Sequence, residues 1–402
     1  MIEQNWQKNI IISLLFCAFI YYFWKSGIIY NYSFFPIVKE GKLHIFADWA
    51  YIIKNIICNN LGFDILKPNT CIGENNLVFN LGNILLYIPY FRSLEKFYFF
   101  YFPIIIGFLF IYSVVSLIKP KKFIEYFLLI LIIFAPPSLL VLERGNFDII
   151  IFLMIILMVY STSSILNFAI LTFVSLAKYY PIALMVNFFI EKKRNIRQVI
   201  IVLLLFILSI TFLFYLTGES LQLFQHKMKI VSSTWGNQFS IRGLSLVLKK
   251  LKNFDYSTVL FISYIFFIFS SIVSFKIFQK SNFISKVNIS FFEEKLFILG
   301  SNLSIAVYLI SDNVHYREIF LILLLPLVIK LKDNFKIKIF KYLFYFILVR
   351  YIFFIFANYF IMFKKYFTFI YIKAFSDIVL VSLFTAICVI MNIEILKQLT
   401  KK

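Results

Sequence analysis

The stretch ILNFAILTFVSLAKYYPIALMVNFFI, residues Ile165–Ile190, decides the fold class of this chain. It exceeds the roughly 20 apolar residues that a helix needs to cross a bilayer. One charge, Lys178, interrupts the run, and Pro181 follows soon after. Proline disrupts the helix that contains it, and broken helices are tolerated in membranes where protein encloses them. The stretch therefore predicts a membrane segment with a break at Lys178–Pro181.

The composition extends this prediction to the whole chain. Of 402 residues, 62% are hydrophobic and only 15% are charged, whereas charged residues make up about 25% of ordinary globular proteins. A soluble domain would lack the polar side chains to cover its surface. The net charge of +21 lies in short Lys and Arg clusters between apolar runs, as the positive-inside rule produces. We therefore expect membrane lipids, and no nucleic acid, as partners.

The other apolar runs predict an all-α, polytopic transmembrane helical bundle with about 10 to 12 membrane segments, in a single domain over residues 1–402. Residues 25–96 are expected to form an external loop. Within it, Leu77–Tyr90 is short and polar enough to be re-entrant or interfacial. The predicted spans besides Ile165–Ile190 are Asn9–Trp24, Phe97–Ile118, Phe123–Leu142, Phe147–Tyr160, Val199–Thr217, Thr258–Phe275, Leu296–Ile310, Ile319–Ile329, Ile339–Phe363 and Ala374–Leu396.

The basic clusters predict the orientation of the chain. With the break at Lys178, all of them can face the cytoplasm, with both termini, in the plasma or inner membrane. The opposite, external face then receives nearly every unusual polar residue, which indicates one site rather than scattered ion pairs. The basic clusters are Lys119–Lys122, Glu191–Arg197, Lys276–Lys295, Lys330–Lys341 and Lys397–Lys402.

Asp48 begins the segment DWAYIIKNII, whose apolar residues recur at helical spacing. The pattern predicts an amphipathic helix lying along the membrane interface. One interpretation of Asp48 is a helix N-cap; another is a general base at the membrane boundary, and the two are compatible. Farther along the loop, Cys58 and Cys71 leave a disulfide open as a possibility, and no spacing indicates a metal.

Other polar residues expected on the external face allow both a functional and a structural interpretation. Lys178 suits a phosphate ligand, or reaches toward the interface as lysines near membrane ends do. Arg144 and Asp148 flank Gly145-Asn146 and predict either site residues or a turn closed by a local ion pair.

Two later segments add candidates of the same kind. Asn237, Gln238 and Arg242 suit sugar hydroxyls and phosphate oxygens, or a loop held by its own amides. His315 and Arg317 suit an anionic ligand, or a plain surface turn.

In their order along the chain, these segments resemble the GT-C glycosyltransferases, and glycosyltransferase family 87 in particular. The family contains polyprenol-phosphate-mannose-dependent mannosyltransferases. The resemblance runs from about residue 40 to 320. It rests on FADWAY around Asp48, ERGNFD at 143–148, AKYYP at 177–181, GNQFSIRG at 236–243 and the turn around His315. The sequence departs from the family where Phe239 interrupts the Asn-Gln-Ser-Leu segment and where Gly-Asn replaces Gly-Gln.

The resemblance implies a hexosyltransferase of GT-C fold. It would move a hexose, mannose first, from a polyprenyl-phosphate donor to a glycan or glycolipid acceptor on the external face. The implied reaction is an inverting single displacement, with Asp48 as the catalytic base. No nucleotide cofactor is needed, and metal dependence stays open. The implied donor-phosphate ligands are Lys178, Arg242, His315, Arg317 and Arg144, and the implied sugar or acceptor ligands are Asn237, Gln238, Asn146, Asp148 and Tyr180.

Two other functions are compatible with a membrane protein of this composition. A lipid-linked sugar transporter or flippase would carry polar residues through the depth of the bilayer, whereas here they gather toward one face. A polysaccharide polymerase would use lipid-linked oligosaccharides on the same face, so the sequence separates it poorly from the transferase. The sequence does not determine the sugar, the acceptor, the linkage or the oligomeric state.

Overall fold

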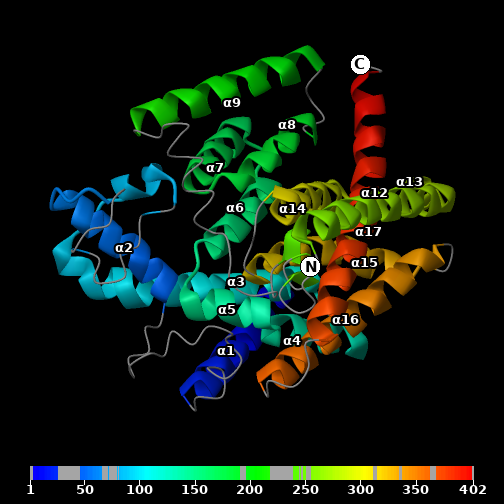
Figure 1. The fold of residues 1–402 in the computed structure, drawn as a ribbon, viewed down its shortest axis with the longest axis horizontal. Helices are drawn as coiled ribbons and strands as arrows, with labels where there is room; N and C mark the ends of the chain where they lie inside the picture. Colours follow the sequence, from blue (N-terminus) through cyan, green and yellow to red (C-terminus); the bar gives the residue numbers. More distant parts are fainter. Residues whose placement is uncertain are drawn as a thin grey trace.

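The computed structural model describes residues 3–25, 46–65, 71, 79, 81–190, 196–217, 239–243, 245, 248–249, 255–310, 315–334, 337–362 and 368–400. Within these ranges the chain is helical and contains no strand (Figure 1). The sequence-predicted all-α class is therefore confirmed for the described part of the chain.

The helices follow the predicted apolar runs closely. The predicted amphipathic helix after Asp48 is present as α2, with most of its apolar side chains buried. The run at Phe123–Leu142 is divided into α4 and α5 by Pro136-Pro137. The α-helices are α1 (Glu3–Lys25), α2 (Ala47–Asn60), α3 (Phe102–Ile118), α4 (Phe123–Phe134), α5 (Pro136–Arg144), α6 (Asp148–Tyr160), α7 (Ser164–Ala177), α8 (Asn187–Ile190), α9 (Ile196–Leu216), α12 (Tyr256–Ser281), α13 (Phe283–Lys286), α14 (Phe291–Ile310), α15 (Leu325–Lys332), α16 (Lys338–Met362) and α17 (Thr368–Thr400).

Short 3₁₀-helical and π-helical segments lie between several of the α-helices. Within the described part of Leu77–Tyr90, the region predicted to be re-entrant or interfacial, lies the 3₁₀ turn η2 (Asn83–Tyr87). A second 3₁₀ turn, η3 (Arg92–Leu94), and the π-helical η4 (Phe97–Tyr101) come after it, and η4 forms the first turn of the predicted span Phe97–Ile118. The predicted break at Lys178 is confirmed, because α7 ends at Ala177 and the 3₁₀ segment η5 (Tyr180–Val186) starts again at Tyr180-Pro181. A fourth 3₁₀ segment, η6 (His315–Leu324), leads into α15.

Within the described residues, five helices are long and apolar enough to cross a membrane, and six if α4 and α5, bent by 45° at their junction, form one span. This number is lower than the predicted 10 to 12 segments. The shorter predicted runs, such as α6 and α7, carry many fully buried residues. Their apolar character therefore reflects contact with other helices as much as contact with lipid. A multi-pass membrane protein fits these helices.

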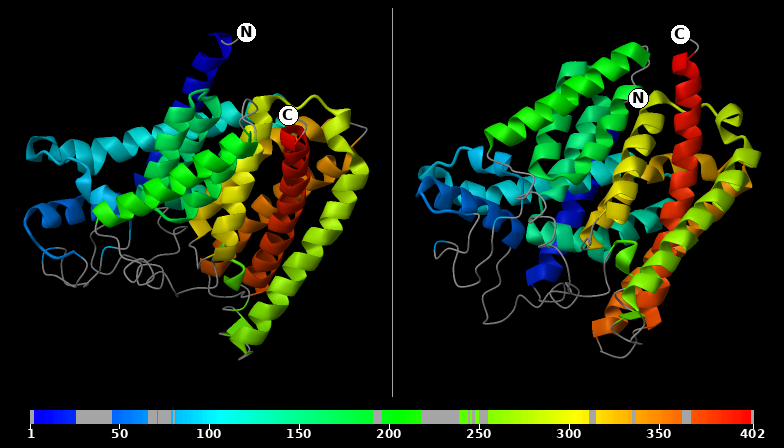
Figure 2. Two further views of the ribbon diagram at one scale, coloured as in Figure 1. Left: turned by 90° about the horizontal axis from the view of Figure 1, so that it is seen from above. Right: turned by 45° about the horizontal axis from the view of Figure 1, so that its top comes forward.

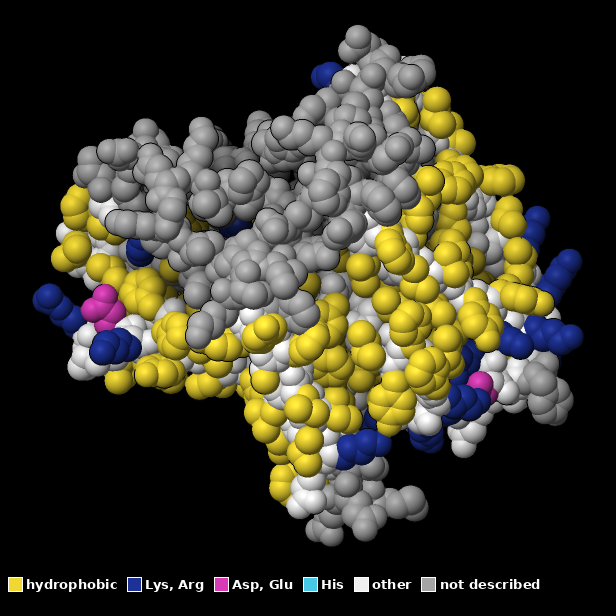
Figure 3. Space-filling model, turned by 90° about the horizontal axis from the view of Figure 1, so that it is seen from below, with side chains coloured by type: hydrophobic (Ala, Val, Ile, Leu, Met, Phe, Trp, Pro, Cys, Tyr) yellow, Lys and Arg dark blue, Asp and Glu magenta, His cyan; other side chains and the backbone are white. Residues whose placement is uncertain are grey.

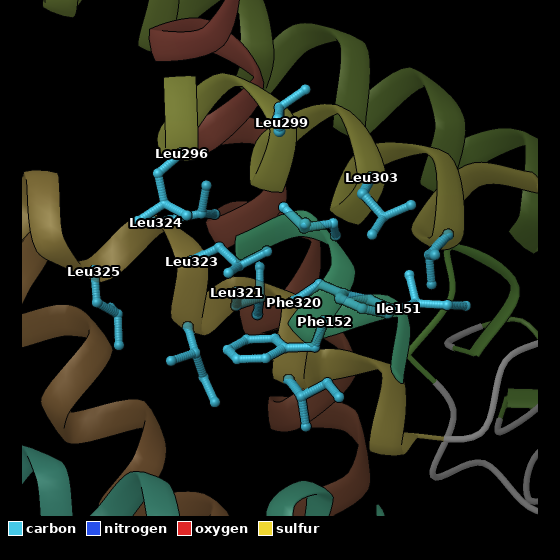
Figure 4. Close-up of a cluster of buried hydrophobic side chains, with 14 of the residues drawn as sticks. Ile151, Phe152, Leu296, Leu299, Leu303, Phe320, Leu321, Leu323, Leu324 and Leu325 are labelled. Atoms are coloured by element: carbon cyan, nitrogen blue, oxygen red, sulfur yellow. The ribbon is translucent and has the colours of Figure 1, made fainter. Parts of the chain in front are cut away.

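The core lies where α14 packs against η6 and α6. Figure 4 shows Leu296, Leu299 and Leu303 of α14 facing Phe320, Leu323 and Leu324 across this interface, with Ile151 and Phe152 of α6 beneath. Each of these side chains is 1% exposed or less. This packing fixes the direction of η6, and therefore the position of the polar residues at its start.

Charged residues separate to two ends of the bundle. At one of them, here named the basic end, Lys122 pairs with Asp333 over 2.8 Å and Lys332 pairs with Glu125 over 2.6 Å. Helices α4 and α14 begin there. In the left view of Figure 2 the N and C labels both lie toward the same upper edge. Figure 3 shows a broad hydrophobic surface, with Lys and Arg side chains gathered along its lower right margin.

Candidate functional site

The candidate site is built at the opposite end of the bundle, where the start of α2 meets the end of α5. Helix α5 ends at Arg144 and is capped by Gly145, whose φ of +55° lies in the left-handed region that glycine adopts readily. A Cβ at Gly145 would lie 3.1 Å from the Phe46 Cβ. Phe46 donates its backbone N–H to the Glu143 carbonyl over 2.8 Å. The ERGN turn thus holds α2 directly against α5.

Asp48 lies in the first turn of α2 and is not its N-cap. Phe46 occupies the N-cap position, and no side-chain hydrogen bond caps the helix. The Asp48 carboxylate instead accepts hydrogen bonds from Arg144 and Asn146: Arg144 Nε donates to Oδ1 over 2.8 Å, Arg144 Nη2 donates to the same oxygen, and Asn146 Nδ2 donates to Oδ2. The N-cap interpretation is therefore wrong. Distant residues fix this carboxylate in position.

The local ion pair between Arg144 and Asp148, one of the two interpretations of these residues, is not formed. Arg144 pairs with Asp48, and Asp148 pairs with Lys178 and, over 3.4 Å, with Arg317. Gly145 and Asn146 do form the predicted turn. The local pairing fails because the helix-terminal turn directs the two charged side chains to different partners on α2 and after α7.

Asp148 is fully buried and is the centre of a second group. Lys178 Nζ donates to its Oδ1, and the Tyr180 hydroxyl donates to the same oxygen over 2.5 Å. The Arg317 guanidinium lies 4.6 Å from the centre of the Tyr180 ring. Lys178 is 6% exposed, so it does not reach toward the interface as the structural interpretation of the sequence required. Its ammonium is already paired with a carboxylate.

Asn146 joins the two carboxylates into one network. Its amide Nδ2 donates to Asp48, while its Oδ1 accepts from Lys178 Nζ over 3.2 Å and from the Asp148 backbone N–H over 2.9 Å. An amide can donate on one side and accept on the other, so Asn146 is suited to this bridge. The network is here named the Asp48 cluster and comprises Asp48, Arg144, Asn146, Asp148, Lys178, Tyr180 and Arg317.

The Asp48 cluster is partly open at Asp48. The side chains of Asp48 and Arg144 are 22% and 21% exposed, whereas that of Asp148 is fully buried. Its three cations and two carboxylates leave a formal net charge of +1. An anion could therefore approach from the Asp48 side, and a hydroxyl donor could reach the remaining lone pairs of that carboxylate.

Tyr316 is a site residue that the sequence analysis missed. Its phenol interacts electrostatically with Arg317, Asp148, Asp48 and Arg144, and burial raises its pKa to about 12. The phenol is therefore protonated at neutral pH and keeps a hydrogen-bond donor. The signal available in the sequence was its position between His315 and Arg317.

The remaining candidates are placed only in part. Asn237 and Gln238 lie outside the described residues, as does the side chain of His315. Arg242 follows a segment anchored to the end of α14, where the Ile241 backbone N–H donates to the Tyr308 carbonyl over 3.0 Å. This anchor puts Arg242 next to the end of α14.

A group of four buried charges lies beside the cluster and was not singled out from the sequence. Arg350 of α16 donates to Glu318 over 2.7 Å and to Asp377 of α17, and Lys373 pairs with Glu318 and Asp377 over 2.7 and 2.8 Å. None of the four is more than 4% exposed. We name them the charged quartet. Charges inside apolar runs are functional candidates by default, and that rule would have found Arg350 and Asp377.

Within the described part of the chain, no group of three or more His, Cys, Asp and Glu side chains is placed to hold a metal ion. Cys58 at the end of α2 is joined to Cys71 by a disulfide, with Cα atoms 5.9 Å apart. The disulfide that the sequence left open is thus present.

Comparison of this chain with protein-family models, with curated proteins and with solved structures found no match.

Proposed function

We propose that this protein is an integral membrane glycosyltransferase of GT-C type, which moves a hexose from a polyprenyl-phosphate donor to a glycan or lipid-linked acceptor. The observation that carries the proposal is the arrangement of Asp48. Its carboxylate is partly exposed, stands at the start of an amphipathic helix, and is held by Arg144 and Asn146. A general base needs a fixed carboxylate within reach of the acceptor hydroxyl.

The proposed reaction is a single displacement. Asp48 takes the proton of the acceptor hydroxyl, and the hydroxyl oxygen forms a bond to the anomeric carbon of the donor sugar. The bond between that carbon and the phosphate oxygen breaks, and its electron pair leaves with polyprenyl phosphate. The configuration at the anomeric carbon is inverted. Cations at the site stabilise the negative charge that develops on the leaving phosphate.

The pairing of Lys178 refines the roles within this mechanism. Because its ammonium is bound to Asp148 and Asn146, we assign it to holding Asn146, and through Asn146 the Asp48 carboxylate. Arg317 also pairs with Asp148, but its contact is longer and its side chain is 12% exposed, so we assign the donor phosphate to Arg317, with Arg242 and His315 as further ligands. Arg144 has the same positioning role toward Asp48. Tyr180 places Asp148, and the sugar contacts expected for Asn237 and Gln238 stay part of the proposal.

The disulfide and the basic end support the proposed location. Disulfides persist in oxidising compartments such as the periplasm and the cell surface, and Cys58–Cys71 lies on the helix that carries Asp48. Lysine pairs cluster at the opposite end of the bundle, where the positive-inside rule puts the cytoplasm. We therefore propose that the Asp48 cluster faces the exterior of the plasma or inner membrane and that both termini face the cytoplasm.

A second candidate function, transport of a lipid-linked sugar across the bilayer, is favoured by the charged quartet. Ionisable residues buried in membrane segments mark transport pathways in many proteins. Here Arg350 and Asp377 belong to two helices long and apolar enough to span a membrane. We rank this function below transfer, because the four charges are fully paired with each other.

The decisive experiment measures sugar transfer in vitro. Purified protein is incubated with polyprenyl-phosphate mannose, glucose and other hexose donors and with acceptor glycans, and release of polyprenyl phosphate is followed. Wild type should release it and the Asp48→Asn variant should not, while both show the same thermal unfolding in detergent. Full activity of the folded Asp48→Asn variant would exclude Asp48 as the base. Movement of intact lipid-linked sugar between the leaflets of proteoliposomes, without release, would favour the transporter.

A further inference from the structure

A pocket lies at the end of α2 that is opposite Asp48. It is a half-open pocket of about 210 Å³, formed by the turn after α2, by η2 and by the residue that follows α9. The pocket is separate from the Asp48 cluster, since none of the cluster residues lines it. Its polar and aromatic lining residues are Asn59, Phe63, Asp64, Asn83, Tyr87 and Thr217, and the aliphatic Ile65 and Leu86 complete the wall.

Backbone and covalent contacts hold the first wall of the pocket. After α2, the Phe63 backbone N–H donates to the Cys58 carbonyl over 3.0 Å, and Phe79 donates to Ile65 over 3.1 Å. The Cys58–Cys71 disulfide ties the end of α2 to the following loop. The turn that carries Asp64 is therefore fixed in several ways, although it lies at the edge of the molecule.

The second wall is attached to the candidate site itself. Gly82 donates its backbone N–H to the Ala177 carbonyl over 3.0 Å, directly before Lys178. Asn83 Nδ2 donates to the Thr217 carbonyl over 2.9 Å. Hydrogen bonds thus connect the wall of the pocket to the end of α7, next to Lys178 of the Asp48 cluster. Along α2, Asp48 and Asn59 are separated by about 16 Å, from the rise of roughly 1.5 Å per residue of an α-helix.

The side chains of the pocket fit a neutral, hydroxyl-rich ligand. Asn59 and Asp64 offer amide and carboxylate groups that bind hydroxyls, and the rings of Phe63 and Tyr87 are 40% and 66% exposed. A sugar ring has a rim of hydroxyls and an apolar C–H face, and an aromatic ring supplies an apolar surface of matching size. The lining residues include Asp64 and neither Lys nor Arg, so a phosphate would be repelled.

We propose that this pocket binds a sugar residue of the acceptor glycan, several residues away from the hydroxyl that reacts at Asp48. The inference rests on the proposed transferase function and adds that the acceptor is an oligosaccharide rather than a single sugar. The same chemistry serves a free oligosaccharide and the glycan of a glycolipid. The segment that follows Tyr87 in the chain carries further exposed aromatic residues, Phe91, Phe97 and Tyr101, which suit the membrane interface. Both the free and the lipid-linked glycan are therefore tested.

The experiment measures binding of neutral oligosaccharides of two to six hexoses to the purified full chain by calorimetry. A second arm uses glycolipids with the same glycans in nanodiscs. The Asp48→Asn variant should still bind the glycan, because the pocket lies away from the base. Asp64→Asn and Tyr87→Ala should each weaken binding at least tenfold. Phe123→Ala, an aromatic side chain that is 85% exposed at the basic end, is the matched control and should bind as wild type does.

The outcomes separate this proposal from the proposed function. Where transfer is measurable, the pocket variants should raise the KM for the acceptor at least tenfold and leave the KM for the donor unchanged. Binding that persists in a folded Asp48→Asn variant without transfer supports both proposals. Full transfer by Asp48→Asn together with loss of glycan binding in Tyr87→Ala would overturn the base assignment alone. Absence of glycan binding in both arms, equal binding by both pocket variants, or preference for inorganic phosphate would overturn the pocket proposal.

Discussion

Arg144 Nε donates to Asp48 Oδ1 over 2.8 Å although 96 residues separate the two in the chain. The contact joins the end of α5 to the start of α2, and its geometry depends on the left-handed Gly145 between Arg144 and Asn146. Because Asn146 holds the other oxygen of the same carboxylate, the ERGN turn alone supplies both ligands of Asp48. The proposed base is therefore oriented by a helix terminus rather than by its own helix.

Arg144→Gln should lower kcat more than it raises the KM for the donor. The variant keeps a polar side chain but loses the guanidinium that fixes Asp48, and small displacements of reacting groups can cost roughly a hundredfold in rate. Arg144→Lys should lie between this variant and wild type, since an ammonium replaces the charge but not the fork geometry. Steady-state kinetics with both substrates measure the effect. An unchanged kcat in Arg144→Gln would contradict a positioning role.

Lys178→Met should destabilise the protein by about 3–5 kcal/mol, since it removes a partner from a fully buried carboxylate. The double variant Lys178→Met/Asp148→Asn should recover only part of this loss, because it removes the buried carboxylate but also breaks the ion pair that Arg317 makes with Asp148. If Lys178 positions Asn146, both the single and the double variant should have lower transfer activity than wild type. Thermal unfolding in detergent measures stability, and Lys121→Met, a lysine exposed at the basic end, serves as control. Equal stability of Lys178→Met and wild type would contradict the buried pair.

The charged quartet makes a separate prediction about stability. Lys373→Met leaves Glu318 and Asp377 with Arg350 as their one cation, and should cost about 3–5 kcal/mol. The neutral double variant Lys373→Met/Glu318→Gln should be more stable than the single variant. Lys280→Met, at an exposed position of α12, should have no such effect. If Lys373→Met unfolds at the wild-type temperature, the quartet is not the buried network described above.

Gly82→Ala should prevent η2 from packing against the end of α7. A Cβ at Gly82 would lie 1.6 Å from the Leu176 carbonyl oxygen, a backbone atom that cannot move aside alone. We expect a large loss of folded protein, measured by size-exclusion chromatography. Gly107→Ala is the control, because its Cβ would meet only the Leu142 side chain at 3.2 Å and alanine favours a helix interior by about 1 kcal/mol. Equal yields of the two variants would contradict the close approach.

The Cys58–Cys71 disulfide tests the orientation in the membrane. In a background with Cys17→Ala and Cys388→Ala, mild external reduction should let a membrane-impermeant maleimide label these two cysteines on intact cells. A cysteine introduced by Lys121→Cys at the basic end should be labelled only after permeabilisation. Mass shifts on gels measure the labelling. The reverse pattern would place the Asp48 cluster on the cytoplasmic side.

Local properties of the sequence determined much of the fold. Helical spacing of Trp49, Ile52 and Ile53 predicted α2 as the structure has it, and Pro181 predicted the break after α7, because these features act within a few residues. The number of membrane segments was less certain, since an apolar run such as 147–160 is equally compatible with lipid contact and with burial between helices. The grouping of Asp48, Arg144, Lys178 and Arg317 toward one end followed from the charge pattern alone.

Only the tertiary structure decided how those residues pair. The sequence allowed a local ion pair between Arg144 and Asp148 because they are neighbours, and it allowed Lys178 to bind a phosphate or to reach toward the interface. In the folded chain Asp148 takes Lys178, and Arg144 takes Asp48. Buried charges need partners because leaving one unpaired in a low-dielectric interior is costly, and which partner lies within reach depends on helix packing between segments far apart in the chain. The tertiary structure likewise decided that Arg350, Lys373, Glu318 and Asp377 form one buried group and that Cys58 is bonded to Cys71.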